Sequence, residues 1–197
     1  MKEKKLVEPP AEWDCGIIIS DIRKSGEPRV EKIELKLGGT VEYWGQSYAP
    51  SSPLRALVTA DWTNGGIVIR VELDCKFRVS CYRCLEETGI AIKGDMRYIF
   101  SLRQSETSDE KTSRSSDDDI GEPDGAEEII SIDPQKADID MAPYIWETMI
   151  LNLPQRVLCV EECKGLCIKC GSNRNEAECA CTEDDSDPRL EVLKKLM

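Results

Sequence analysis

Eight of the ten cysteines in this chain occur as four closely spaced pairs. The pairs are Cys81/Cys84, Cys159/Cys163, Cys167/Cys170 and Cys179/Cys181. Four thiolates complete a tetrahedral zinc site, so eight cysteines match the ligand requirement of two ions. This count constrains the fold strongly, because a shared ion would hold segments about 75 residues apart in the sequence at one point.

The spacing favours one division of these cysteines into two sites. Cys167, Cys170, Cys179 and Cys181 can close a site locally, because a Cys-x-x-Cys turn directs two thiolates at one ion and Gly171 can adopt a left-handed backbone conformation. The second site then falls to Cys81, Cys84, Cys159 and Cys163, which would join the end of a sheet to the segment after Pro154.

Two alternatives to this division remain open. The first has a single ion in the tail with a shuffled ligand set, such as Cys163, Cys167, Cys170 and Cys179, and leaves Cys81 and Cys84 free or redox-active. The second has no metal. Disulfides are disfavoured in a reducing compartment, and a Cys179–Cys181 disulfide would close a strained ring over one residue.

The chain contains no histidine, which removes histidine general bases, Ser-His-Asp triads and mixed Cys/His metal sites. The paired spacing favours structural zinc over iron–sulfur ligation and leaves iron open as the alternative metal. Four protein ligands leave no position for water or substrate, so we expect structural zinc and no catalytic residues. The isolated Cys15 and Cys75 are expected to be structural, with Cys75 a small buried hydrophobe of a strand.

Residues 30–100 alternate apolar and polar side chains and predict strands. Ile33, Leu35 and Leu37 share one face, and Asn64-Gly65-Gly66 is a hairpin signal between two apolar runs. The expected fold class is therefore α+β, with a mainly antiparallel sheet that either stays open or curls towards a barrel. A helix and a small Cys-rich zinc-binding tail with a terminal helix follow.

Four regions are expected along the chain. Residues 1–103 form the antiparallel β region with the Cys81/Cys84 knuckle. Residues 104–128 hold ten acidic and two basic residues and predict a flexible acidic loop, which is either a solvated insertion or a docking segment for a basic partner. Residues 129–158 add a strand and a helix to the core, and residues 159–197 form the zinc-binding tail.

Two helices are predicted from caps and apolar spacing. The first has an N-cap within 138–140, Pro143 in its first turn and an apolar stripe of Ile145, Trp146, Met149, Ile150 and Leu153 that ends at Pro154. Trp146 and Met149 are interpreted as core residues. The second helix starts at Asp187-Pro188 and runs to the end of the sequence, with a stripe of Leu190, Leu193 and Met197.

The formal net charge is −12, and two four-thiolate zinc sites would make it roughly four units more negative. An acidic chain gains little from phosphate neutralisation, so a basic protein partner is favoured over nucleic acid. Lys164, Lys169, Arg174 and Arg83 form the one basic cluster in the cysteine turns, where they either contact RNA or face solvent beside the anionic sites. The sequence as given contains no membrane span and no secretory signal, which predicts a cytoplasmic protein.

A set of motifs spread over roughly residues 30–197 resembles one known family. They are Ser80 to Glu86 (SCYRCLE), Ile139-Asp140 with Pro143, Glu147 to Pro154, Cys163-Lys-Gly-Leu-Cys167-x-x-Cys170-Gly171, Asn175, Cys179-x-Cys181 and Asp187-Pro-Arg-Leu190. Together they look like the bacterial YceD family, the large ribosomal RNA subunit accumulation proteins.

The resemblance implies a non-catalytic ribosome-biogenesis factor that supports accumulation or processing of large-subunit rRNA. It also implies a ribosomal protein or a pre-ribosomal particle as partner, and no membrane or small-molecule substrate. The alternative from a different class is a thiol-disulfide or redox-sensing protein that uses Cys81 and Cys84. Redox Cys-x-x-Cys motifs normally begin a helix, whereas strand-like sequence surrounds this one.

Overall fold

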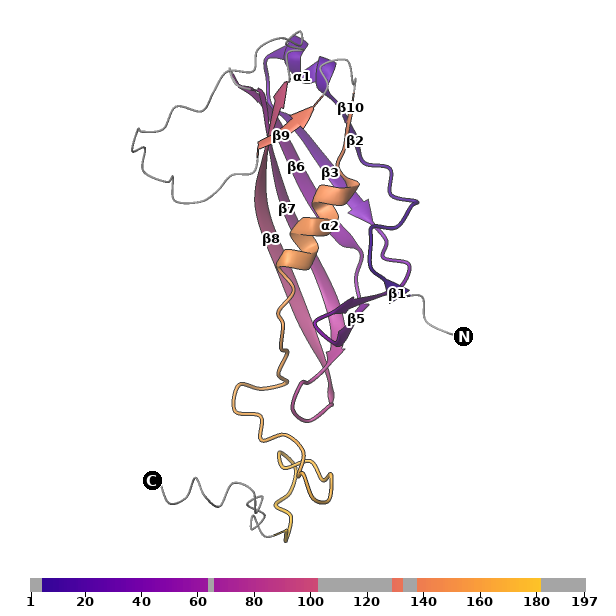
Figure 1. Cartoon of the computed structure of the whole chain (residues 1–197), viewed down its shortest axis with the longest axis vertical. Coiled ribbons are helices and arrows are strands. Elements are labelled where there is room, and N and C mark those ends of the chain that lie inside the picture. Colours follow the sequence, from indigo (N-terminus) through magenta and orange to yellow (C-terminus); the bar gives the residue numbers. More distant parts are fainter. Residues whose placement is uncertain (1–4, 64–65, 103–128, 133–137, 182–197) are drawn as a thin grey trace, which may run out of the picture. The chain divides into compact units, whose positions relative to one another are not determined.

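The computed structural model describes residues 5–63, 66–102, 129–132 and 138–181 (Figure 1). The acidic segment expected at 104–128 and the helix expected from Asp187 lie outside these residues. The described elements are β1 (Lys5–Leu6), β2 (Gly16–Ile18), α1 (Ile19–Ser25), β3 (Arg29–Leu35), β4 (Thr40–Tyr43), β5 (Gln46–Pro50), β6 (Leu54–Thr63), β7 (Gly66–Ser80), β8 (Glu87–Leu102), β9 (Ile129–Ile132), β10 (Asp138–Asp140) and α2 (Ala142–Leu151).

The chain divides into two compact units, each considered by itself below. Unit 1 contains Met1–Val79 and Gly89–Gln155, and unit 2 contains Ser80–Thr88 and Arg156–Met197. Neither described helix has the length and hydropathy that a membrane span requires.

Unit 1 is built on the predicted hairpin of β6 and β7. Thr63 pairs with Gly66, and the antiparallel register continues to the pair of Arg55 and Asp74. Along β7 the buried and more exposed positions alternate, because successive side chains of a strand point to opposite faces. The alternation read from the sequence is therefore confirmed, and every buried side chain of β7 from Ile67 to Val79 is apolar.

The sheet is open and only mainly antiparallel. Its order is β1-β4-β5-β7-β6-β3, with β8 on β7 and β9 on β8, and the pairs β1–β4 and β8–β9 are parallel. Within the described strands the order does not return to its start, so the alternative of closure towards a barrel is wrong. Helix α2 lies along the sheet (Figure 1), and its apolar side chains Ala142, Ile145, Trp146 and Met149 are buried.

Helix α2 begins slightly later than the sequence indicated. The segment predicted as its N-cap, Asp138–Asp140, is strand β10 and pairs with β2. Asp140 still serves the helix start, since its Oδ1 accepts a hydrogen bond from Ala142 N at 2.9 Å, and the helix carries its proline in the first turn. Trp146 and Met149 are buried, which confirms their assignment to the core.

The contact of α2 with β8 is close and includes polar groups. The Tyr98 hydroxyl lies 3.0 Å from the Thr148 hydroxyl and donates to the Tyr144 carbonyl at 3.0 Å, so these buried polar groups are paired. A side chain at Gly94 would place its Cβ 2.9 Å from Thr148 Cγ2 and 3.0 Å from Asn152 Nδ2. Glycine at this position therefore lets the helix approach the strand.

The sequence interpretation missed β1, β2 and α1, and it interpreted the residues of β10 as a helix cap. The run Ile17-Ile18-Ile19 shows why, because a short apolar run fits a strand or a helix equally well. In the structure it is divided between β2 and α1, and Ile17 and Ile19 are buried while Ile18 is exposed. Tertiary contacts, such as the pairing of β2 with β10, decide the outcome.

Candidate metal centres

Unit 2 contains two cysteine turns, of which the first connects β7 to β8. Cys81 N donates to the Glu86 carbonyl at 2.8 Å, and Leu85 N donates to the Cys81 carbonyl at 3.0 Å. These hydrogen bonds close the residues between the strands into a tight knuckle. The chain reverses direction between β7 and β8, which pair with each other. The short turn between them holds the side chains of Cys81 and Cys84 close together.

The segment after residue 155 is bound to this knuckle by backbone hydrogen bonds. Tyr82 N donates to the Val157 carbonyl at 2.7 Å, and Leu166 N donates to the Arg83 carbonyl at 3.2 Å. The Arg83 guanidinium also donates to the Cys163 carbonyl at 2.9 Å. At Gly165 a Cβ would lie only 3.1 Å from the Arg83 oxygen, so glycine permits this approach.

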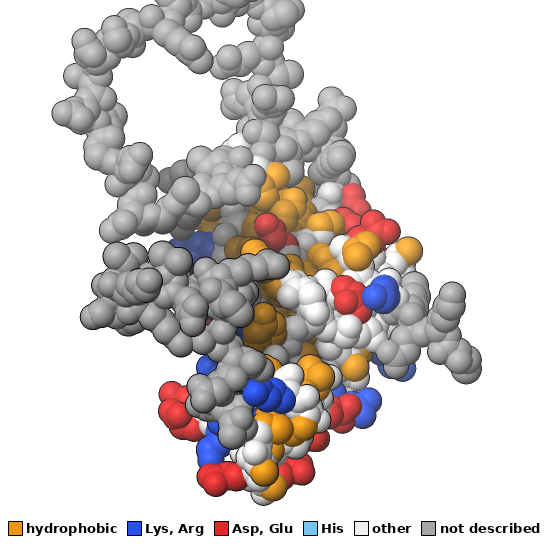
Figure 2. Space-filling model, turned by 60° about the horizontal axis from the view of Figure 1, so that its bottom comes forward, with side chains coloured by type: hydrophobic (Ala, Val, Ile, Leu, Met, Phe, Trp, Pro, Cys, Tyr) orange, Lys and Arg blue, Asp and Glu red, His pale blue; other side chains and the backbone are white. Residues whose placement is uncertain are grey.

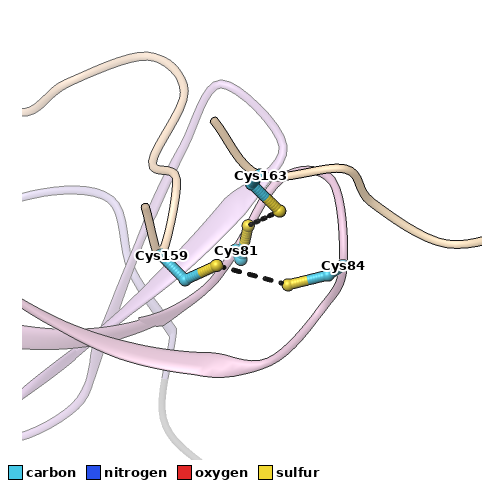
Figure 3. Close-up of side chains that lie close together, drawn as sticks. All are labelled: Cys81, Cys84, Cys159 and Cys163. Atoms are coloured by element: carbon cyan, nitrogen blue, oxygen red, sulfur yellow. Dashed lines mark hydrogen bonds between the residues drawn. The ribbon is translucent and has the colours of Figure 1, made fainter. Parts of the chain in front are cut away.

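The four sulfur atoms of Cys81, Cys84, Cys159 and Cys163 point towards one another (Figure 3). The Sγ atoms of Cys81 and Cys163 are 3.7 Å apart, and those of Cys84 and Cys159 are 3.5 Å apart. In a tetrahedral site with zinc–sulfur bonds of about 2.3 Å, two sulfurs are separated by about 3.8 Å. The spacing fits a shared ion and is far longer than a disulfide bond of about 2.05 Å.

Local donors favour the thiolate form of two of these cysteines. Burial would raise the pKa of Cys81, but hydrogen bonds from the backbone of Cys84 and Arg83 outweigh it and lower the pKa to about 6. The side chain of Asn175 lowers the pKa of Cys163. The pKa of Cys159 rises to about 12, because its thiol shares a hydrogen bond with Cys84 and is desolvated. A divalent cation would replace such shared protons.

The second set consists of Cys167, Cys170, Cys179 and Cys181, whose sulfurs lie within 4.8 Å of one another. Gly171 N donates to the Cys167 carbonyl at 2.8 Å and closes the turn. Backbone N–H groups of Cys170 and Lys169 lower the pKa of Cys167 to about 6, and the hydroxyl of Ser172, 3.1 Å from Cys170 Sγ, lowers the pKa of Cys170. This is again a donor set suited to a thiophilic cation.

The structure thus brings together the same two sets of four cysteines that the spacing favoured, and all eight are free thiols. The shuffled set with Cys163 in the tail site is not formed. Cys15 and Cys75 lie apart from both sets and are buried, and burial raises the pKa of Cys15 to about 11 and of Cys75 to about 12. Their expected structural role agrees with this burial.

Asn175 links the loop of the second set to a sulfur of the first, a role that the sequence motif did not reveal. Its Nδ2 donates to Cys163 Sγ at 3.3 Å, and its Oδ1 accepts from Lys164 N at 2.7 Å. Asn175 lies between Cys170 and Cys179 in the sequence, so the same loop serves both sets. Arg174 N, which donates to the Gly165 carbonyl at 2.9 Å, fixes this loop in place.

We expect Asn175→Ala to weaken metal binding at the first set by about 10- to 100-fold, since the partners of metal ligands contribute that much to affinity. Zinc competition against a chromophoric chelator measures the change. Asn152→Ala is the matched control, because Asn152 makes a comparable amide hydrogen bond to the Thr148 carbonyl in unit 1. Equal zinc retention in both variants would show that the Asn175 contact does not support the site.

Unit 1 also has an open hollow of about 830 Å³, lined in part by Ile33, Leu73 and Asn152. Its rim mixes Lys32, Arg55 and Lys93 with Glu34, Glu72, Asp74 and Asp95. The described lining has no cysteine, and both sets of four cysteines belong to unit 2.

Comparison with known proteins gives a family match over residues 69–197, more than half of the chain. The family is described as Large ribosomal RNA subunit accumulation protein YceD. The chain is also similar to the Large ribosomal RNA subunit accumulation protein YCED homolog 1, chloroplastic, of Arabidopsis thaliana. The two are 27% identical over 120 residues, which cover 55% of this chain and 37% of the relative, so the chain matches well under half of that protein. No solved structure matches the chain significantly.

Proposed function

The chain belongs to the YceD family of large ribosomal RNA subunit accumulation proteins, and from this premise we propose that it is a non-catalytic ribosome-biogenesis factor. In this proposal it supports accumulation or processing of large-subunit rRNA, and its two cysteine sets hold structural zinc. It acts in the cytoplasm, on a ribosomal protein or a pre-ribosomal particle. The family match over residues 69–197, which includes both cysteine sets, carries the proposal.

Structural zinc is supported by the completeness of each set. Four sulfurs surround each centre, and three of the four cysteines in the first set are buried. An ion bound in this way has no position for water or substrate, which is the arrangement of structural rather than catalytic zinc. The ion would join the knuckle at 81–84 to the segment at 159–163 and thereby hold unit 2 together.

The alternative of a thiol-disulfide protein that uses Cys81 and Cys84 has less support. The lowered pKa of Cys81 would suit a reactive thiol. However, the sequence after Cys84 leads into strand β8 rather than a helix, and both thiols are buried. A reactive cysteine needs access for its oxidant or substrate, which this knuckle restricts.

Depletion of the protein in its native cell tests the proposed function. We expect large-subunit rRNA to fall relative to small-subunit rRNA, because only assembly of the large subunit is affected. Quantitative profiling of both rRNAs during depletion measures the ratio, and re-expression of the wild-type chain must restore it. An unchanged ratio would refute the role in rRNA accumulation whatever the metal content of the protein.

A further inference from the structure

The two Cys-x-x-Cys knuckles of unit 2 share one backbone conformation but differ at the residue that follows the second cysteine. In both, this residue donates its N–H to the carbonyl of the first cysteine, from Leu85 to Cys81 and from Gly171 to Cys167. In both, its φ is positive, at 63° for Leu85 and 72° for Gly171. Leucine and glycine can therefore be compared at the same turn position within this chain.

Glycine is the residue that this conformation favours, because a Cβ is disfavoured at positive φ. Nothing lies within 4 Å of a Cβ built at Gly171, so the conformation and not the available space accounts for glycine there. Leucine at such a φ is an outlier for a bulky side chain, and strained residues of this kind concentrate at functional sites.

The Leu85 side chain is 64% exposed, so it gains little from burial within its own chain. Tyr82, three residues earlier in the same knuckle, is 51% exposed. A leucine with positive φ that is mostly exposed to water does not stabilise the folded chain. Its favourable contacts are therefore expected outside the chain.

The neighbouring residue Tyr82 has two contacts within unit 2. Tyr82 N donates to the Val157 carbonyl at 2.7 Å, and the Arg156 guanidinium carbon lies 5.1 Å from the centre of the Tyr82 ring. A tyrosine that is already ordered loses little conformational entropy on binding, and tyrosine is enriched among the residues that dominate interface energies. Leu85 and Tyr82, called the knuckle surface below, make an exposed apolar contact site.

We propose that the knuckle surface binds a basic protein, which under the proposed function is a protein of the large ribosomal subunit. Unit 2 holds six carboxylates and five cations in its described part, and each set of four thiolates would add two negative charges with a zinc ion bound. Exposed Glu86 directly follows Leu85, and Glu161 and Glu162 are exposed near the sites.

The two arginines at the knuckle surface already make contacts within the chain. This favours a basic protein over RNA as the partner. Arg83 donates to the Cys163 carbonyl and Arg156 lies over Tyr82. RNA binding would draw on cations to neutralise phosphates, and the local balance is negative. A positively charged protein is attracted to this charge and can bury the two apolar side chains. Figure 2 shows exposed hydrophobic side chains among acidic and basic ones on one face of the molecule.

Binding to purified components tests this surface. The zinc-loaded chain is titrated against individually purified, RNA-free large-subunit ribosomal proteins and against a transcript of large-subunit rRNA. We expect the wild type to bind at least one of these proteins more tightly than the transcript.

Leu85→Gly removes the side chain and keeps the positive φ of the backbone. We therefore expect the zinc content to be unchanged and the affinity for that protein to be lowered by about tenfold or more. Val30→Ala, at a 56% exposed position in unit 1, should bind as the wild type does.

Three results would overturn the inference: no ribosomal protein binds, the transcript binds more tightly, or Leu85→Gly binds as tightly as the wild type. Loss of zinc in Leu85→Gly would also overturn it, by showing that leucine serves the fold. Complementation separates this inference from the proposed function. If Leu85→Gly fully restores large-subunit rRNA in depleted cells, the surface is dispensable while the family role stands. If binding depends on Leu85 but depletion leaves rRNA unchanged, the binding surface is supported and the proposed role in rRNA accumulation is refuted.

Discussion

Cys163→Ser is expected to reduce the zinc content from two ions per chain to one and to make the segment 156–166 sensitive to protease. Serine is a poor zinc ligand, and the substitution leaves three thiols around the first centre. Structural zinc in small domains contributes about 10–16 kcal/mol of apparent binding free energy, comparable with the total stability of a domain of about 5–15 kcal/mol. Among the described residues of unit 2, the buried apolar cluster is small and lies around Cys81, Cys84 and Cys163, so the ion would contribute much of the stability of this region.

The tryptophans make it possible to follow unit 1 separately in this experiment. All four, Trp13, Trp44, Trp62 and Trp146, belong to unit 1. We therefore expect the tryptophan fluorescence and its unfolding transition to change little in Cys163→Ser, while zinc analysis and limited proteolysis report the loss in unit 2. The protein is purified without oxygen, so that oxidation does not imitate metal loss.

Cys75→Ser is the matched control, because it removes another buried thiol that lies outside both cysteine sets. It should keep two zinc ions and an intact 156–166 segment, although it destabilises unit 1. Two ions in Cys163→Ser would show that this cysteine is not a ligand. A wild-type chain without metal that forms a reversible Cys81–Cys84 disulfide would favour the redox alternative instead.

Met149→Ala should lower the free energy of unfolding of unit 1 by about 2–5 kcal/mol, because it leaves a cavity under helix α2. Met149 is fully buried and lies one helical turn from Trp146. The rings of Trp146 and Trp13 meet edge to face, with their centroids 6.1 Å apart. A loss of this size is a large part of the stability of an ordinary domain. Urea unfolding followed by tryptophan fluorescence measures it.

Leu151→Ala is the control on the same helix, since Leu151 is 58% exposed. Surface substitutions of this kind change stability by about 0.5 kcal/mol or less. Both variants should keep two zinc ions, so the effects of Met149→Ala and Cys163→Ser fall on different units. Equal destabilisation by the two α2 substitutions would contradict the burial of Met149.

Several features followed from the sequence because they depend on residues close together in the chain. The β6–β7 hairpin has a turn signal between two alternating runs, and the four cysteine pairs are set by spacings of two to four positions. The start of α2 shows the limit of such local signals. Asp140 was expected in the cap and does bond Ala142 N, yet pairing with β2 also makes it the end of a strand.

Tertiary structure decided what depends on residues far apart. Local spacing permits several partitions of the eight cysteines, whereas the hydrogen bonds of Tyr82 to Val157 and of Leu166 to Arg83 place Cys159 and Cys163 beside the first knuckle. Side-chain alternation predicts a sheet but not its closure, because closure depends on which strands meet at its edges. The sequence by itself determined the fold class, the four cysteine pairs and the family likeness. Only the three-dimensional arrangement decided the open sheet, the Asn175 link and the positive φ that Leu85 shares with Gly171, since each depends on contacts or backbone angles that residue types alone leave free.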